Sequence, residues 1–508
     1  MPNAHPAIEL KGLTKGFGSI VANQDIDLTV FNGEILALLG ENGSGKTTLM
    51  NMLSGLYRPD AGEIYVSGRP VSIHSPHDAI ALGIGMIHQH FKLVDVLSVQ
   101  ENIVLGTVGH FAGKRKLSRE IRELCERFGL MIDPERKVYS LSVSEKQTVE
   151  ILKVLYRGAR TLVLDEPTAV LTPQEIGRLF DILRKMREQG CAIIIITHKL
   201  NEVLEISDRV TILRKGRCIG TVETRSTTAR ELTERMVGAS VDLSIHRPEP
   251  LRSGPMLDVH HLTVVNSDGV RALDDVNFSI ASGEILGVAG VAGSGQKELC
   301  EAIAGLQPIA GGAILCEHTS LEGLSPREII RRGISMSFIP EDRLGMGLVA
   351  SMGMVDNMLL KDYQNQPGML IRREGARNLA NSLVKQLNIS TPSIYTAVRK
   401  LSGGNVQKVL LGREIASNPR ILITAYPVRG LDINSSMTIY RMLNDQKQKG
   451  VAVLYIGEDL DVLLELCDRI LVLCGGRVTG IVDAAGVTKE QLGLLMAGQT
   501  AEEAMRNG

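Results

Sequence analysis

One short segment of this 508-residue chain combines glycines, a lysine and a threonine in a pattern that can hold phosphate. The segment GENGSGKT, Gly40 to Thr47, follows an apolar run at Ile35 to Leu39 and leads into TTLMNMLSGL, which has helical periodicity. Its inner glycines let the backbone curl with N–H groups inward, and the following helix N-terminus adds partial positive charge. Lys46 can reach the terminal phosphates and Thr47 can ligate Mg²⁺. A plain glycine turn needs neither residue, so the spacing predicts a nucleotide-binding phosphate loop.

A second segment places two carboxylates where an apolar run ends. In LVLDEPT, Leu162 to Thr168, Asp165 can hold Mg²⁺, and Glu166 can orient and deprotonate an attacking water. An isolated Asp-Glu pair is more often a helix cap. The phosphate loop upstream favours the catalytic interpretation.

These motifs belong to a chain that repeats itself. GEILALLGENGSGKTTL at Gly33 recurs as GEILGVAGVAGSGQKEL at Gly283, and LSVSEKQTVEILKVL at Leu141 recurs as LSGGNVQKVLLGREI at Leu401. Short, wholly apolar runs resemble parallel strands buried on both faces, with helical segments between them. The sequence therefore predicts two α/β domains, 1–240 and 256–508, joined by a proline-containing linker, 241–255.

The order of motifs resembles that of the ATP-binding subunits of ABC transporters, in the tandem form of importers for simple sugars and nucleosides. The resemblance covers both halves and is closest to purine nucleoside importers. It implies that each domain has a RecA-like P-loop core, an antiparallel β subdomain and a helical subdomain. It further implies that Gln89 senses Mg²⁺ and the membrane subunit, His198 contacts the γ-phosphate, and Phe17 stacks on adenine.

In that family each ATP lies between one domain's phosphate loop and the other domain's LSGGQ signature. The resemblance thus implies catalytic roles for Glu166, His198 and Gln89, and a Mg²⁺ site of Thr47, Gln89 and Asp165. The residues expected to bind ATP are Phe17, Gly40, Glu41, Asn42, Gly43, Ser44, Gly45, Lys46, Thr47, Thr48, Ser402, Gly403 and Gly404.

The two halves differ at these positions. In the second half Gln296 replaces the lysine, and Ala425 and Tyr426 stand where the first half has its carboxylates. The signature shows the reverse, because LSGGN at Leu401 is intact whereas LSVSE at Leu141 has lost both glycines. We therefore expect one hydrolytic site and one degenerate site. Neutral drift in the second half is the alternative, but it does not explain the intact signature there.

Composition limits what the chain can bind. The net charge is −1 and aromatic residues make up 3%, so no global field or set of rings favours nucleic acid. The longest apolar runs are strand-length and no signal peptide is evident, so we expect no membrane-spanning segment. The resemblance implies a peripheral protein on the cytoplasmic face of the membrane. The resemblance implies partnership with two permease subunits and an extracytoplasmic solute-binding protein. The alternative is a soluble tandem ABC ATPase that acts on ribosomes or DNA.

Overall fold

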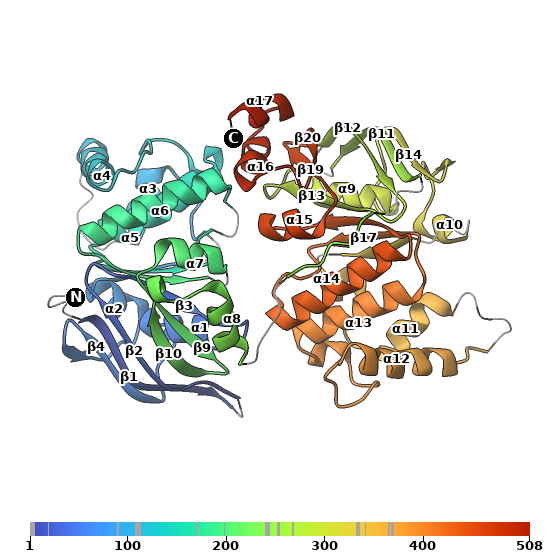
Figure 1. Cartoon of the computed structure of the whole chain (residues 1–508). Helices are drawn as coiled ribbons and strands as arrows, with labels where there is room; N and C mark the ends of the chain where they lie inside the picture. The colour runs from blue at the N-terminus through green and yellow to red at the C-terminus, as the bar shows by residue number, and fades with distance from the viewer. Residues whose placement is uncertain are drawn as a thin grey trace. The chain divides into compact units, whose positions relative to one another are not determined.

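The computed structural model describes residues 6–18, 20–88, 91–106, 113–168, 171–197, 199–238, 244–250, 254–266, 269–331, 336–340, 342–363, 366 and 370–507, and the structural statements below concern these residues. The chain separates into two compact units, Met1–Asp242 and Leu243–Gly508 (Figure 1). Among the described residues, no helix combines the length and apolar character that a membrane crossing requires.

The first unit contains a central, mainly parallel sheet and a smaller antiparallel one. The central sheet has the order β10-β9-β3-β8-β7-β6, with only β10 antiparallel to its neighbour. Its strands are β3 (Ile35–Leu39), β6 (Ile84–Ile87), β7 (Thr161–Asp165), β8 (Ala192–Ile196), β9 (Arg209–Arg214) and β10 (Arg217–Glu223). The antiparallel sheet, of order β2-β1-β4-β5, consists of β1 (Pro6–Phe17), β2 (Ile20–Phe31), β4 (Ala61–Val66) and β5 (Arg69–Val71).

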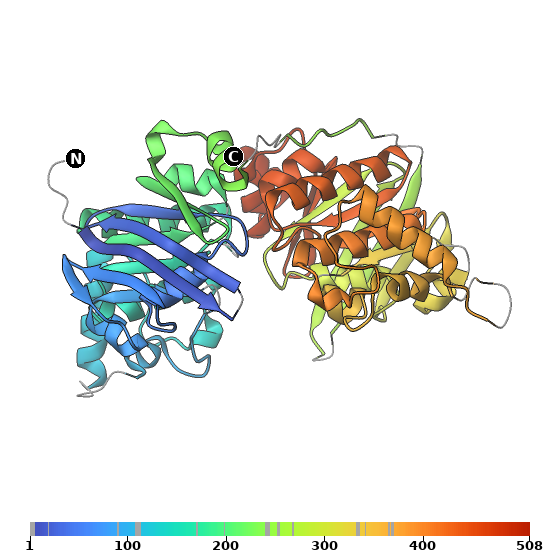
Figure 2. The same ribbon diagram turned by 90° about the horizontal axis from the view of Figure 1, so that it is seen from below.

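Helices cover both faces of the central sheet. They are α1 (Lys46–Leu53), α2 (Pro76–Ala81), α3 (Val99–Val104), α4 (Lys114–Phe128), α5 (Val143–Tyr156), α6 (Pro173–Glu188), α7 (Leu200–Ile206) and α8 (Ala229–Val237), with 3-10 turns η1 (Val138–Ser140) and η2 (Thr224–Ser226). Figure 1 shows α3 to α6 on one side of the first unit's central strands and β1, β2 and β4 on the other, and Figure 2 shows β1 and β2 nearest the viewer.

The central strands are wholly apolar because their alternate side chains enter two different cores. Ile193 and Ile195 of β8 pack with the helices α3 to α6, whereas Ile194 and Ile196 pack with α1 and the antiparallel sheet. All residues of β3 and β8 are buried. The prediction of buried parallel strands is confirmed, and β3 spans the residues of the apolar run at Ile35 to Leu39.

The second unit repeats the architecture. Its central sheet has the order β16-β17-β18-β13-β19-β20, and its antiparallel sheet the order β12-β11-β14-β15. The strands are β11 (Pro255–Val265), β12 (Arg271–Ala281), β13 (Ile285–Gly290), β14 (Gly311–Cys316), β15 (Thr319–Ser320), β16 (Met336–Ile339), β17 (Ile421–Ala425), β18 (Ala452–Ile456), β19 (Arg469–Cys474) and β20 (Arg477–Asp483). The helices are α9 (Gln296–Ile303), α10 (Pro326–Arg331), α11 (Met354–Asp362), α12 (Glu374–Gln386), α13 (Gly403–Ala416), α14 (Ile433–Gln448), α15 (Leu460–Leu466), α16 (Lys489–Met496) and α17 (Ala501–Asn507), with a π-helical turn η3 (Arg343–Gly347) and a 3-10 turn η4 (Val398–Lys400).

Part of the predicted linker, residues 244–250, contacts the second unit. Arg247 Nη1 donates to the carbonyls of Leu464 and Cys467, at 3.1 and 2.6 Å. The Pro248 carbonyl accepts a hydrogen bond from Lys447, whose buried ammonium also lies 2.6 Å from Asp468 Oδ1. These bonds hold the described part of the segment against α14 and α15.

Candidate functional site

The phosphate loop of the first unit lies between β3 and α1 and has a backbone that only glycine permits at key points. Gly45 has φ 99°, and a Cβ there would lie 2.5 Å from the Ala22 carbonyl oxygen of β2. A Cβ on Gly40 would lie 2.5 Å from Ser44 Oγ. Backbone hydrogen bonds brace the loop, since the Ser44 amide donates to the Glu41 carbonyl and the Ser44 carbonyl accepts a bond from the Gly216 amide. The loop is therefore a fixed cradle.

Lys46 lies inside this cradle. Its Nζ donates to the carbonyls of Gly40 and Glu41, at 2.6 and 3.0 Å. Burial lowers the pKa of Lys46, while the charges of Glu166, Asp165 and Glu41 oppose that shift. A buried ammonium that donates to neutral carbonyls is well placed to exchange those carbonyls for phosphate oxygens.

A second polar group in the cradle has no partner in the described part of the chain. Ser44 Oγ is buried without a hydrogen bond, which costs about 1–3 kcal/mol when nothing satisfies it. A phosphate oxygen can accept a bond from this hydroxyl. The orphaned hydroxyl, the glycine-only backbone and the buried ammonium together fit a nucleotide's phosphates.

Asp165, the predicted Mg²⁺ ligand, is the last residue of β7, and Glu166, the predicted catalytic base, follows it directly. Burial and the charge of Glu166 raise the pKa of Asp165, and Lys46 opposes the rise. Glu166 has φ 46°, an uncommon conformation for a residue with a side chain, and its amide donates to Ile196 at 2.9 Å. The strained turn holds the second carboxylate at the carboxyl end of the sheet, where ligands of such sheets bind.

The same residues fit a magnesium ion. Mg²⁺ prefers hard oxygen ligands and keeps several waters. Thr47, whose side chain is exposed, follows Lys46, and Asp165 is close enough to Lys46 to affect its pKa. A divalent cation here would relieve the repulsion between Asp165 and Glu166 that raises the pKa of Asp165. The structure thus brings Lys46, Asp165 and Glu166 together as the motif spacing predicts.

Phe17 ends β1 and lies beside a second ring. Its centroid is 5.2 Å from that of Tyr57, in an edge-to-face arrangement, and Lys15 Nζ lies 5.6 Å from the Phe17 ring. Both rings are partly exposed, and Tyr57 follows α1 shortly after the phosphate loop. Tyr57 and Lys15 could not be found from sequence motifs, because no spacing rule links the first strand to the turn after α1.

Some residues predicted to bind ATP or Mg²⁺ lie outside the residues that the structure describes, and others lie in the second unit. Gln89 and His198 lie outside the described residues, so their roles stay predictions. Gly403 and Gly404 begin α13 in the second unit, and Ser402 is the N-cap residue before them, with its Oγ accepting a bond from Asn405 Nδ2 at 2.8 Å. Their contact with a nucleotide stays a prediction as well.

The phosphate loop of the second unit keeps its shape and changes its chemistry. Gly295 has φ 104°, nearly that of Gly45. Gln296 is buried like Lys46, and its Nε2 donates to the Val291 carbonyl at 3.1 Å. Lys297 does not replace the lost ammonium, because its side chain is 69% exposed and lies near Glu301, with 3.9 Å between Nζ and Oε1.

The catalytic turn of the second unit shows the same pattern. Tyr426 has φ 49° and its amide donates to Ile456 at 2.9 Å, so the backbone matches that of Glu166. Arg429 lies 5.8 Å from the Tyr426 ring and pairs with Glu458 at 3.4 Å. The second unit therefore holds the turn without a carboxylate at its apex.

The position equivalent to the ring pair is also altered. Gln307, the repeat counterpart of Tyr57, donates through Nε2 to the Val265 carbonyl at 3.3 Å. The bond lies at the end of β11. At the equivalent position in the first unit, the end of β1, the rings of Phe17 and Tyr57 pack together. Among the described residues at this point of the second unit, Val265 and Asn266 offer no ring on which a base could stack.

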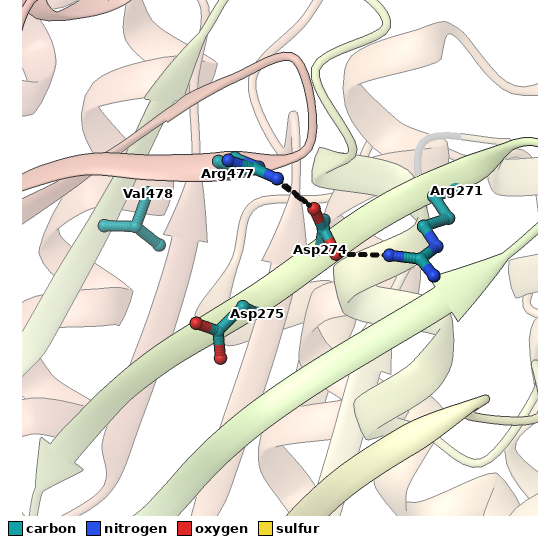
Figure 3. A pocket seen from close by; sticks show the side chains of 5 residues that line it. All are labelled: Arg271, Asp274, Asp275, Arg477 and Val478. Atoms are coloured by element: carbon teal, nitrogen blue, oxygen red, sulfur yellow. Dashed lines mark hydrogen bonds and ion pairs between the residues drawn. The ribbon is translucent and has the colours of Figure 1, made fainter.

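A shallow pocket of about 370 Å³ lies between β12 and β20 of the second unit. Figure 3 shows Arg477 and Arg271 directed at Asp274, with Nη-to-oxygen distances of 2.6 and 3.2 Å. Asp275 and Val478 complete the lining. Both arginines are already paired and two carboxylates face the space, so this pocket suits a triphosphate poorly.

The comparisons with known proteins agree with the geometry of the first unit. Residues 23–169 and 273–427 match the family described as ABC transporter. The chain is 44% identical to the guanosine import ATP-binding protein NupO of Bacillus subtilis, over 98% of each chain. It is 41% identical to the nucleoside import ATP-binding protein NupA of Lactococcus lactis, over 98% of this chain and 99% of that one. It is also 41% identical to the ribose import ATP-binding protein RbsA 1 of Rubrobacter xylanophilus, with the same coverage. The chain belongs to the ABC transporter family, with two ATP-binding domains in tandem.

Proposed function

We propose that this protein is the ATP-hydrolysing subunit of an importer that takes up a nucleoside or a simple sugar through partner permeases. The observation that carries the proposal is the cluster of Lys46, Asp165 and Glu166 in a family whose similar members are import ATP-binding proteins. In this proposal the chain docks on the cytoplasmic side of two permease subunits, and an extracytoplasmic binding protein delivers the solute.

Hydrolysis takes place in the first unit. Lys46 exchanges its bonds with the loop carbonyls for phosphate oxygens, and Ser44 Oγ gains the partner that it lacks. Thr47 and Asp165 hold Mg²⁺, which neutralises phosphate charge. Glu166 accepts the proton of the attacking water.

Further residues complete this site in the proposal. Phe17 stacks on adenine, Gln89 and His198 contact the metal and the γ-phosphate, and Ser402 to Gly404 of the second unit close over the phosphates. The second phosphate loop binds nucleotide without hydrolysing it at a comparable rate, because Gln296 and Tyr426 supply neither cation nor base.

The experiment is solute uptake in cells that carry the chain with the permease and binding-protein genes beside it. Radiolabelled guanosine and ribose serve as the two probes. We expect uptake of one of them, and loss of that uptake in a Glu166→Gln variant. Uptake that is unchanged by this variant, or co-sedimentation of the chain with ribosomes in place of membranes, would contradict the proposed function.

A further inference from the structure

The end of β1 is tied to the turn after α1 by hydrogen bonds to Asp60. The Asp60 amide donates to the Thr14 carbonyl at 2.8 Å, and Asp60 Oδ2 accepts a bond from the Gly16 amide at 2.7 Å. Asp60 Oδ1 accepts a bond from Lys15 Nζ at 2.8 Å. The bonds from Lys15 and Gly16 hold the pKa of Asp60 below its usual value, so the carboxylate is ionised at neutral pH. One side chain therefore fixes two consecutive residues at the strand end.

The next residue of the strand end is Phe17, and the same turn supplies a ring that packs against it. The planes of the Phe17 and Tyr57 rings are inclined by 73°, in the edge-to-face arrangement that aromatic pairs prefer. The two residues are 44% and 38% exposed. A phenylalanine at the surface without such a contact can change its rotamer freely. Tyr57 is therefore placed to fix the orientation of the Phe17 ring, and the ring keeps an exposed part for a base.

In the described part of the second unit, this connection keeps its backbone bond and loses the side chains that make the other contacts. The Ala310 amide donates to the Thr263 carbonyl at 2.8 Å, which identifies Ala310 as the counterpart of Asp60. Counted from this bond, the remaining counterparts are Val264 for Lys15, Asn266 for Phe17 and Gln307 for Tyr57. A contact that served the fold alone would be of equal use in both units. Its restriction to the unit with the intact phosphate loop points to the nucleotide.

The side chains of this connection are exposed enough to contribute little to stability. The Asp60 side chain is 51% exposed, and exposed ion pairs stabilise a fold only slightly. The pairing of β1 with β2 and β4 holds the strand without them. What they add is a fixed position for the last residues of β1 relative to α1, the helix that begins at the phosphate loop.

We propose that Asp60 and Tyr57 are positioning residues for ATP binding. Asp60 fixes the end of β1 and Tyr57 fixes the ring of Phe17, so that the base meets a stacking surface that is already formed. A preformed surface binds more tightly because less conformational entropy is lost on binding. The proposal rests on the proposed function, because Phe17 has to stack on the adenine of ATP.

The first test measures ATP affinity by titration calorimetry, and the KM of the ATPase reaction, in the full chain. Asp60→Ala and Tyr57→Gln give the first unit the residues of the second. Each should weaken ATP binding by about three- to tenfold and raise KM more than it lowers kcat, because the residues at the phosphates are untouched. Asp60→Asn should keep most of the affinity, since its amide oxygen can accept the Gly16 bond. Tyr57→Phe should keep the parent affinity, since the ring remains.

Lys11→Met is the matched control for these variants. Lys11 lies on the same strand, six residues before Phe17, and its Nζ is 4.6 Å from the centroid of the Tyr65 ring. This variant removes a cation beside a different ring and should keep the parent affinity. Amide exchange at Gly16 without nucleotide should be about ten- to a hundredfold faster in Asp60→Ala, because its bond is lost. Parent affinity for ATP in Asp60→Ala despite this faster exchange would overturn the proposal.

The second test repeats Asp60→Ala and Tyr57→Gln in a Phe17→Ala background. If both residues act through the ring, neither should weaken ATP binding further by more than about twofold. Equal losses with and without the ring would overturn the proposal, because the two residues would then act elsewhere. An unchanged affinity in Phe17→Ala itself would overturn the proposal together with the adenine contact. Binding is measured without permeases or solute, so the result stands even if the chain proves not to serve an importer.

Discussion

Replacing Lys46 by glutamine would give the first phosphate loop the chemistry of the second. The fold accommodates this side chain, since Gln296 Nε2 bonds the Val291 carbonyl at 3.1 Å where Lys46 Nζ bonds the Glu41 carbonyl at 3.0 Å. Gln296 is also buried to a similar degree. We therefore expect Lys46→Gln to fold.

The expected magnitudes follow from the surroundings of the ammonium. Loss of a preorganised cation costs about 3 kcal/mol of transition-state stabilisation, which is about a hundredfold in rate. The free energy of unfolding should change by less than about 1 kcal/mol, because relief of burial offsets the lost attraction to Glu166 and Asp165.

The assay is steady-state ATPase activity at saturating ATP and Mg²⁺, with thermal denaturation of the same samples. The reciprocal Gln296→Lys variant is the control and should gain no activity, since Ala425 and Tyr426 offer no carboxylate. A folded Lys46→Gln variant with a loss below about tenfold would refute the role given to the ammonium. A large fall in melting temperature would refute the expectation that relief from burying the ammonium offsets its lost attraction to Glu166 and Asp165.

Three further predictions concern single contacts. Asp165→Asn should raise the melting temperature of the nucleotide-free chain at neutral pH, because the raised pKa of Asp165 in the folded state means that its charge destabilises the fold. This gain in melting temperature should vanish as the pH falls toward and below 3.8, where the carboxyl is protonated in both states. A gain that grows on acidification would contradict the raised pKa. Phe17→Ala should weaken ATP binding by about tenfold with little change in the maximal rate, measured by titration calorimetry and kinetics, and an unchanged affinity would exclude stacking. Lys447→Met should destabilise the second unit by about 3–5 kcal/mol in denaturant unfolding, because it leaves Asp468 buried and unpaired. The equivalent ion pair of the first unit, Arg187 with Asp208, is half-exposed, so Arg187→Met should lower the free energy of unfolding by less than about 1 kcal/mol. Equal losses of stability in the two variants would show that burial does not determine what such a pair contributes.

The site could be predicted where local sequence dictates geometry. Gly45 needs positive φ, Lys46 must follow it, and Asp165 must end a buried strand, so spacing alone predicted their cluster. The fold class followed from apolar runs that only a sheet covered on both faces can bury.

The remaining features depend on tertiary contacts that no local pattern encodes. Tyr57 approaches Phe17 from a distant turn. The bond from the Gly16 amide to Asp60 joins residues 44 positions apart, and its donor is a backbone group that any residue type except proline would supply. Such contacts leave little trace in the sequence.

We propose that the first unit alone hydrolyses ATP. The most direct measurement compares the steady-state ATPase rates of Glu166→Gln and Tyr426→Ala in the full chain, each checked for a normal melting temperature. Since Glu166 and Tyr426 occupy the same backbone turn in the two units, the comparison isolates the side chain. We predict that Glu166→Gln abolishes turnover and that Tyr426→Ala leaves it nearly unchanged. Equal losses in the two variants would show that hydrolysis is not confined to the first unit.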